Sequence, residues 1–304
     1  MGKIAFIFPG QGAQYPGMGE DFYAQYATAR EVFEKAEAAT NLNLRQICFE
    51  KNDRLDQTEY TQIAMLTTEL AILRVIEEKG IKADYAGGLS LGEYGALAAA
   101  RVMEEQDLFR MIRKRGIYMQ NAYPVGGAMT AVLGLDAREV EAVLSLIEGE
   151  VSIANYNCPG QIVITGEAGA VEEAALRLKE AGARRCVPLK VSGPFHSPLL
   201  RDASDRLSEA LREVKISDPV IPYVTNVDAT FVTKKDRVKG LLERQVCGSV
   251  RWQQCVENLI TEGVDTFIEI GPGKTLCSFL RKIDPEVMCI NIEKVEDLEK
   301  LADL

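Results

Sequence analysis

Short apolar runs of strand length alternate with amphipathic stretches of helical period along most of the chain. In the first part, the run Lys3–Phe8 predicts a strand, and amphipathic patterns at about 22–39, 58–79 and Glu104–Asn121 predict helices. The second of these helices has one apolar face, formed by Ile63, Leu66, Leu70, Leu73 and Ile76. Strands that alternate with helices in this way favour a mainly parallel sheet covered on both faces.

The order of predicted strands and helices changes between residues 124 and 191. The pattern there predicts strands at Met129–Leu133, Val151–Asn155, Ile162–Thr165 and Arg185–Leu189, with helices at Asp136–Leu146 and Ala168–Ala181. This β-α-β-β-α-β order is that of the ferredoxin-like unit. Pro124-Val125-Gly126-Gly127 and Ser192-Gly193-Pro194 punctuate its two ends, so we predict a small domain at 124–191 inserted into a larger one made of 1–123 and 192–304.

The pattern of the larger domain resumes after residue 191. We expect helices at about 199–214, 234–245 and 250–262, a strand at Val220–Thr225, and then a strand at Thr266–Ile270, a helix at Thr275–Ile283, a strand at Val287–Ile292 and a polar terminal helix.

A serine flanked by glycines stands where a strand pattern meets a helical one. Gly88-x-Ser90-x-Gly92 has the form of a nucleophile elbow, in which the glycines allow a sharp strand-to-helix turn and the serine hydroxyl projects from it. The small residues of 95–100 suit a helix packed tightly against a sheet. Ser90 is therefore the candidate nucleophile, and a solvated serine in an ordinary turn is the alternative.

A serine needs a base to attack at neutral pH, and His196 is the only histidine of the chain. It lies in the proline-framed loop Ser192–Pro198, at the predicted domain junction, where a side chain can be aimed. Paired with an elbow serine, His196 is the candidate general base; alone it would be an unremarkable polar loop residue.

The Gly-rich loop after the first strand, Pro9–Gly19, invites comparison with a dinucleotide-binding turn. That interpretation fails because Tyr15 stands at the third glycine of G-x-G-x-x-G. We expect instead a loop whose backbone amides face an active site.

The composition of the chain limits the kinds of protein to which it can belong. A chain of 304 residues that is 47% hydrophobic and 26% charged can bury a large core, and it has no apolar run of the about 18 residues that span a membrane. The sequence passes directly from Met1 into a strand, so we expect a cytoplasmic protein with no membrane partner. A net charge of -10 argues against nucleic acid as the main partner.

Seven cysteines contain no C-x-x-C pair, and we expect reduced thiols; they stand at 48, 158, 186, 247, 255, 277 and 289. With one histidine and no close cysteine pair, no metal site is expected.

Six motifs in order resemble those of the malonyl-CoA:acyl carrier protein transacylases and cover almost the whole chain. They are Pro9-Gly10-Gln11-Gly12-Ala13-Gln14, Gly88-Leu89-Ser90-Leu91-Gly92-Glu93-Tyr94, Arg115-Gly116…Met119-Gln120, Asn155-Tyr156-Asn157, Gly193-Pro194-Phe195-His196-Ser197 and Glu269-Ile270-Gly271-Pro272-Gly273. The resemblance implies an α/β-hydrolase-like large domain, an inserted ferredoxin-like domain, and an active site in the cleft between them.

The resemblance also implies roles for individual residues. Ser90 would be acylated, His196 would be general base and acid, and the backbone amides of Gln11 and Leu91 would form the oxyanion hole. The backbone carbonyl of Gln245 would orient the histidine in place of a carboxylate.

Arg115 would hold the malonyl carboxylate, and a planar guanidinium suits that two-point contact on chemical grounds as well. Asn155, Asn157 and Phe195 would lie at the substrate, although core packing is an equal alternative for Phe195. A solvated basic face shared with Arg110, Arg113 and Lys114 is the alternative for Arg115. Leu89 departs from the family, which usually has histidine before the serine.

The implied reaction is ping-pong transfer of malonyl from malonyl-CoA to Ser90 and then to the phosphopantetheine thiol of acyl carrier protein, by a monomer without bound cofactor. An acyl hydrolase of the same fold and a non-catalytic carrier-docking module are the alternatives; Arg115 weighs against the first and the Ser90–His196 pair against the second. A carrier is acidic by family expectation, so the surface of this protein to which it docks should be locally basic. The candidates are Arg177, Lys179, Arg184, Arg185, Lys190, Lys274, Arg281 and Lys282.

Overall fold

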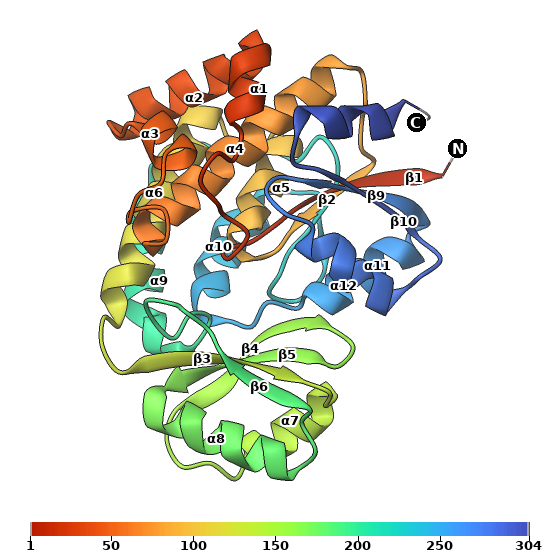
Figure 1. Cartoon of the computed structure of the whole chain (residues 1–304). Coiled ribbons are helices and arrows are strands. Elements are labelled where there is room, and N and C mark those ends of the chain that lie inside the picture. Colours follow the sequence, from red (N-terminus) through yellow and green to blue (C-terminus); the bar gives the residue numbers. More distant parts are fainter. Residues whose placement is uncertain (1, 303) are drawn as a thin grey trace.

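The computed structural model describes residues 2–302 and 304 and contains two separate β-sheets (Figure 1). The larger sheet is built from β1 (Lys3–Phe8), β2 (Tyr85–Gly88), β7 (Tyr223–Val224), β8 (Phe231–Val232), β9 (Val264–Ile270) and β10 (Met288–Ile292). Its order is β10-β9-β1-β2-β7-β8, and every neighbouring pair is parallel except β7 with β8. The expected mixed α/β chain with a mainly parallel sheet is confirmed.

Helices cover both faces of this sheet. They are α1 (Glu20–Gln25), α2 (Ala27–Thr40), α3 (Leu44–Phe49), α4 (Thr58–Glu78), α5 (Glu93–Ala99), α6 (Glu105–Ala122), α9 (Arg201–Arg212), α10 (Val238–Cys247), α11 (Trp252–Thr261) and α12 (Thr275–Ile283). Successive side chains of β1 point to opposite faces of the sheet and so belong to two different hydrophobic clusters. Phe6 and Phe8 pack with the side that carries α1 to α6, α9 and α10, whereas Ala5 and Ile7 pack with α11 and α12.

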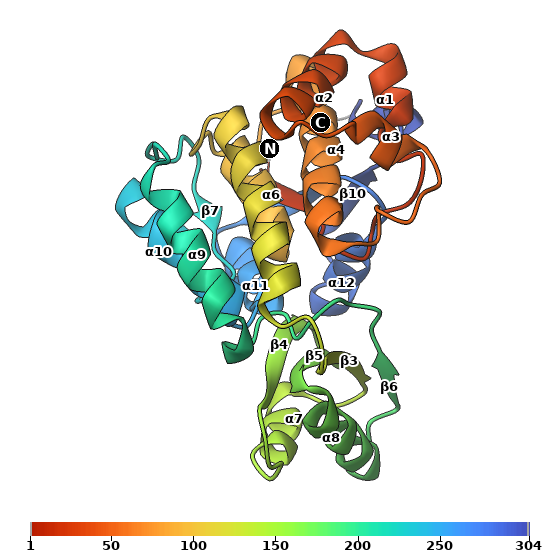
Figure 2. The same cartoon turned by 90° about the vertical axis from the view of Figure 1, so that its left-hand side faces the viewer.

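The smaller sheet is antiparallel and lies at one end of the molecule (Figure 2). Its strands are β3 (Gly127–Leu133), β4 (Val151–Cys158), β5 (Gln161–Glu167) and β6 (Arg185–Pro188), in the order β4-β5-β3-β6, and α7 (Ala137–Leu144) and α8 (Ala168–Glu180) share a core with it. Strand β4 is also tied to the larger part, because the amide of Tyr156 donates to the carbonyl of Val250 and the amide of Val250 to that of Ala154.

Several boundaries differ from the sequence-based expectation. The helix expected at 22–39 is two helices, because Tyr26 between them is extended, and α3 was not expected at all. The last helical segment, Val295–Leu301, is a 3₁₀ helix, as are the turns Ser90–Gly92, Pro198–Leu200 and Lys235–Arg237. In the described part of the chain, no helix is both long and apolar enough to cross a membrane.

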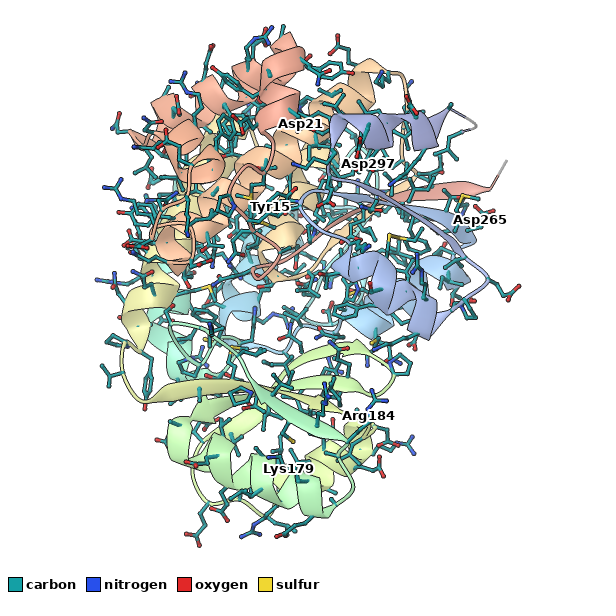
Figure 3. All side chains as sticks on the ribbon, in the orientation of Figure 1. Tyr15, Asp21, Lys179, Arg184, Asp265 and Asp297 are labelled. Carbon is teal, nitrogen blue, oxygen red and sulfur yellow. A yellow bond between two sulfur atoms is a disulfide. The ribbon has the colours of Figure 1, made fainter. Side chains whose placement is uncertain are left out.

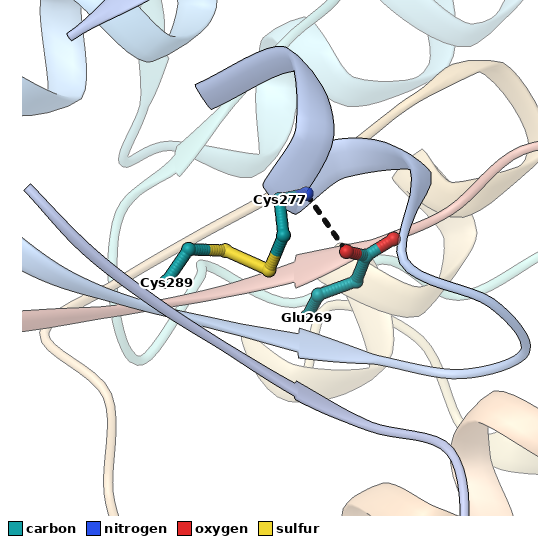
Figure 4. A group of neighbouring side chains, drawn as sticks. All are labelled: Glu269, Cys277 and Cys289. Atoms are coloured by element: carbon teal, nitrogen blue, oxygen red, sulfur yellow. Dashed lines mark hydrogen bonds between the residues drawn. A yellow bond between two sulfur atoms is a disulfide. The ribbon is translucent and has the colours of Figure 1, made fainter. Parts of the chain in front are cut away.

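The expectation of seven reduced thiols is wrong for one pair. Cys277 on α12 and Cys289 on β10 form a disulfide, with Cα atoms 5.5 Å apart (Figure 4). The pair was missed because its partners are 12 residues apart and meet only when α12 leads back to an edge strand of the sheet. Both oxygens of the neighbouring Glu269 accept backbone amides, from Leu276 and Cys277, so this carboxylate caps the start of α12.

Candidate active site

The turn that carries Ser90 requires both of its glycines. Ser90 has a left-handed backbone, with φ of 57°, and is separated from the end of β2 only by Leu89. A Cβ on Gly88 would lie 2.0 Å from the carbonyl oxygen of Gly92, and one on Gly92 would lie 2.2 Å from that of Phe8. The close approach of three backbone segments therefore fixes the strained serine at the carboxyl end of the central strands.

Ser90, His196 and Gln245 form a continuous hydrogen-bonded chain. The Oγ of Ser90 lies 2.7 Å from Nε2 of His196, and Nδ1 of His196 lies 2.8 Å from the backbone carbonyl oxygen of Gln245. A carbonyl can only accept, so Nδ1 carries the hydrogen and Nε2 is free to accept from the serine hydroxyl. His196 is 4% exposed and, like Ser90, has a positive φ, of 60°.

Burial keeps His196 neutral. Desolvation, with a smaller contribution from the nearby charge of Arg115, lowers the pKa of His196 to about 4. At neutral pH the imidazole is therefore unprotonated and able to accept a proton.

Arg115 lies within the protein rather than on a solvated face. It is 1% exposed, and its Nη2 donates to Ser90 Oγ at 3.2 Å and to Oε1 of Gln245 at 3.0 Å, while Nη1 donates to Oε1 of Gln62 at 2.6 Å. The solvated-face alternative is therefore wrong for Arg115. It holds for Arg110, which is half exposed and pairs with Asp107.

A cavity of about 230 Å³ opens at the serine, between the two sheets. Among the residues that line it are Gln11, Leu91, Asn155, Asn157 and Phe195, together with Ser90, His196 and Leu89. The side-chain Oδ1 of Asn157 is buried without a hydrogen-bond partner in the described part of the chain. Arg115 and Gln245 do not line the cavity and reach it only through their contacts with Ser90 and His196.

Three polar residues of the site were missed by the sequence analysis: Gln62, Glu93 and Asn226. Each is at most 2% exposed, and Oδ1 of Asn226 accepts a hydrogen bond from the backbone amide of Ser90 at 2.7 Å. A signal existed for two of them. Gln62 is a polar residue among the buried positions of α4, and Asn226 follows a strand of the parallel sheet, where functional side chains gather.

Comparison with known proteins gives consistent matches over nearly the whole chain. The acyl transferase domain family matches residues 5–286. The malonyl CoA-acyl carrier protein transacylase of Bacillus subtilis is 43% identical, over 98% of this chain and 96% of that protein. The crystal structure of the malonyl CoA-acyl carrier protein transacylase from Clostridium perfringens has a TM-score of 0.96 and 39% identity, and the match covers 99% of this chain and 96% of that one.

A further solved structure is that of a type II PKS acyl-carrier protein in complex with its malonyl-transacylase. It matches with a TM-score of 0.96 and 35% identity, over 99% of both chains. The elbow serine, its buried histidine partner and these full-length matches agree, and the chain belongs to the acyl transferase family.

Proposed function

We propose that this protein transfers a malonyl group from malonyl-CoA to the phosphopantetheine thiol of acyl carrier protein, through a malonyl ester of Ser90. The observation that carries the proposal is that two side chains meet at one hydroxyl oxygen, since Ser90 Oγ contacts both Nε2 of His196 and Nη2 of Arg115. The names of the full-length relatives support the same reaction.

In the first half-reaction, Ser90 Oγ attacks the thioester carbonyl of malonyl-CoA while Nε2 of His196 accepts the hydroxyl proton. The tetrahedral oxyanion is stabilised by the backbone amides of Gln11 and Leu91, which line the same cavity as Ser90. The C–S bond then breaks, and His196 returns the proton to the departing thiol of coenzyme A.

In the second half-reaction, His196 takes the proton of the carrier's phosphopantetheine thiol, which attacks the malonyl ester. Collapse of the second oxyanion breaks the C–O bond, and the proton passes through His196 back to Ser90. The histidine is oriented by the neutral carbonyl of Gln245 rather than by a carboxylate, an arrangement that suits transfer to a thiol better than activation of water.

Selection of malonyl over acetyl is assigned to Arg115. Its guanidinium is buried beside the nucleophile, and its Nε has no hydrogen-bond partner in the described part of the chain. An acyl group with a free carboxylate can satisfy such a cation, whereas an acetyl group leaves it unpaired. Asn155, Asn157 and Phe195 line the cavity and are assigned to substrate contact; the unpartnered Oδ1 of Asn157 can accept a hydrogen bond from the acyl donor.

We further infer that the chain divides into an α/β-hydrolase-like domain, 1–123 with 192–304, and a ferredoxin-like domain, 124–191. The strand order β4-β5-β3-β6 with antiparallel neighbours and the two helices α7 and α8 support the second assignment. No bound cofactor is needed, because the reaction consists of nucleophilic and proton-transfer steps that Ser90 and His196 can perform.

The proposal is tested by intact-mass measurement after the protein is mixed with malonyl-CoA. We expect one malonyl adduct, lost when acyl carrier protein with its phosphopantetheine is added, and absent in Ser90→Ala. A protein that binds malonyl-CoA without forming the adduct would contradict the acyl-enzyme.

A further inference from the structure

A buried acid that the transfer reaction does not use directly lies beneath the site. Glu93 is the first residue of α5, three positions after Ser90, and is fully buried. Its Oε2 accepts hydrogen bonds from Nε2 of Gln245 at 2.7 Å and from the backbone amide of Asn226 at 3.1 Å. Its other oxygen, Oε1, has no partner in the described part of the chain.

The first of these partners, Gln245, contacts the nucleophile, the base and the buried arginine. Gln245 accepts from His196 through its backbone carbonyl and from Arg115 through Oε1, and its Nε2 donates to the backbone carbonyl of Ser90 at 3.0 Å. A rotation of the Gln245 side chain would therefore disturb Ser90 and Arg115 together. The hydrogen bond to Glu93 opposes that rotation.

The second partner holds the other side of the serine. Asn226 accepts the amide of Ser90 through Oδ1 and donates to the carbonyl of Gly88 through Nδ2, both at 2.7 Å. Side chains therefore bind both the N–H and the C=O of Ser90, the residue with the unfavourable left-handed backbone. Both of these side chains belong to residues that donate to Glu93.

Charge gives a second reason for an acid at this position. In the described part of the chain, Arg115 forms no ion pair with a carboxylate, and burial lowers its pKa, an effect that the nearby Tyr94 and Glu93 oppose. An ionised Glu93 therefore compensates a buried cation that otherwise contacts only neutral groups.

We propose that Glu93 is a positioning residue for the transfer reaction, which acts through Gln245 and Asn226 to hold Ser90, His196 and Arg115 in one reactive arrangement. The proposal rests on the proposed function for the identity of the acyl group, but not for the reactivity of Ser90. The acid of a Ser-His-Asp triad contacts the histidine directly; here the acid is separated from His196 by the whole of Gln245.

The proposal predicts a pH dependence. Burial raises the pKa of Glu93 to about 7, and the charged or titratable groups that face it are Arg115 from α6, Tyr223 from β7, Cys255 from α11 and the adjacent Tyr94. Burial also raises the pKa of each of the last three, so near neutral pH only Arg115 is charged among them. Protonation of Glu93 removes the charge-assisted hydrogen bonds and the compensation of Arg115. Reactivity of Ser90 should therefore rise as the pH rises through about 7.

The test measures the rate at which Ser90 is labelled by a fluorophosphonate probe and by malonyl-CoA, over a pH range that includes the pKa values of both Glu93 and His196. In the parent protein we expect the labelling rate to rise twice with pH, near pH 4 where His196 loses its proton and near pH 7 where Glu93 ionises. In Glu93→Gln we expect labelling to be slower by about 10- to 100-fold, the scale of a slightly misplaced reactive group. The rise near neutral pH should be lost, which a purely structural role for Glu93 would not produce.

Glu69→Gln is the matched control, because Glu69 is also fully buried and its carboxylate has no hydrogen-bond partner in the described part of the chain. It should label at the parent rate and keep the rise near neutral pH. A parent profile whose only rise is near pH 4, where His196 titrates, overturns the proposal even if Glu93→Gln fails to fold. Equal rates and profiles in the parent and Glu93→Gln also overturn it. Labelling by the fluorophosphonate without acylation by malonyl-CoA would contradict the proposed function alone.

Discussion

The imidazole of His196 donates from Nδ1 to the backbone carbonyl of Gln245, 2.8 Å away, and thereby presents an unprotonated Nε2 to Ser90. The tautomer is set by an acceptor that carries no charge and cannot itself be protonated at working pH. The orientation of the base therefore depends on where α10 places one peptide group, and the neutrality of the base depends on burial.

The first prediction concerns the base. His196→Ala should bind malonyl-CoA as the parent does but acylate Ser90 roughly 10²- to 10⁴-fold more slowly, the usual contribution of a positioned general base. Rapid-quench measurement of the malonyl adduct gives the rate. Since His196 has a positive φ, His196→Asn is the control for backbone strain, because asparagine tolerates this conformation better than alanine does. Both variants should be slow; a fast His196→Asn would show that the loss in His196→Ala comes from the backbone.

The second prediction concerns the elbow. Gly92→Ala should lower the free energy of unfolding by roughly 1–3 kcal/mol or more, because its new Cβ would overlap the backbone oxygens of Phe8 and Pro9. Chemical denaturation measures the change. Gly240→Ala in α10 is the control, since nothing lies within 4 Å of its new Cβ, and it should be neutral or stabilising. Equal stability of Gly92→Ala and the parent would mean that the turn can open.

The sequence predicted most of the helices and strands because their apolar periodicity is local. The helix Thr275–Ile283 was placed to the residue, between the glycine turn before it and Asp284 after it. Boundaries failed where tertiary contacts decide them. Tyr26 interrupts a continuous amphipathic pattern, and the strand expected at Val220–Thr225 is only Tyr223–Val224.

The site, too, has a part that local sequence predicts and a part that depends on tertiary contacts. The positions of Ser90 and His196 follow from a local motif and from the scarcity of histidine, and the contact of His196 with the Gln245 carbonyl was expected only through the family resemblance. The side-chain contacts among Glu93, Asn226 and Gln245 were not predicted. Hydrogen bonds between buried residues about 20 to 150 positions apart have no periodic signal in one sequence.

The third prediction concerns carrier docking. Lys179 and Arg184 lie on the small antiparallel part of the molecule (Figure 3), and Arg185 and Lys190 are exposed there as well. Reversal of these charges to glutamate should slow transfer to acyl carrier protein by roughly 10-fold at low salt, because the carrier is expected to be acidic. Self-acylation by malonyl-CoA should be unchanged, and the effect should fade as salt is added.

The control for docking is Lys51→Glu combined with Lys82→Glu, two exposed lysines of the larger part. This variant changes the net charge without altering the proposed surface, so it should transfer as the parent does. If the variant with the four reversed charges loses both half-reactions equally, the charge reversal has damaged the site and the docking assignment is wrong.

The fourth prediction concerns the disulfide. Titration of the unreduced, denatured protein should find five thiols, since two of the seven cysteines are paired, and full reduction should reveal all seven. Reduction should lower the free energy of unfolding by about 3 kcal/mol on the chain-entropy model for a loop of this length. Cys289→Ser should reproduce that loss, and Cys186→Ser, at a free thiol, should not. Seven thiols before reduction would contradict the pairing.

The last prediction is that Arg115→Ala inverts acyl preference. The guanidinium is fully desolvated beside Ser90, so a carboxylate bound to it forms charge-assisted hydrogen bonds that are worth far more than the same contacts in water. Malonyl transfer should therefore fall by about two or more orders of magnitude in the variant. Acetyl-CoA should become as good a substrate as malonyl-CoA or better, because no unpaired cation remains in the site.

Arg115 also contacts Ser90 Oγ, Gln62 and Gln245, so its removal can slow acylation by either thioester. The ratio of kcat/KM for malonyl-CoA to that for acetyl-CoA separates the two effects, since a general loss of serine reactivity lowers both values and leaves the ratio unchanged. Arg110→Ala on the same helix removes an exposed arginine paired with Asp107 and should keep the parent ratio. If Arg115→Ala also keeps the parent ratio, the buried guanidinium supports the serine network and a different group must recognise the malonyl carboxylate.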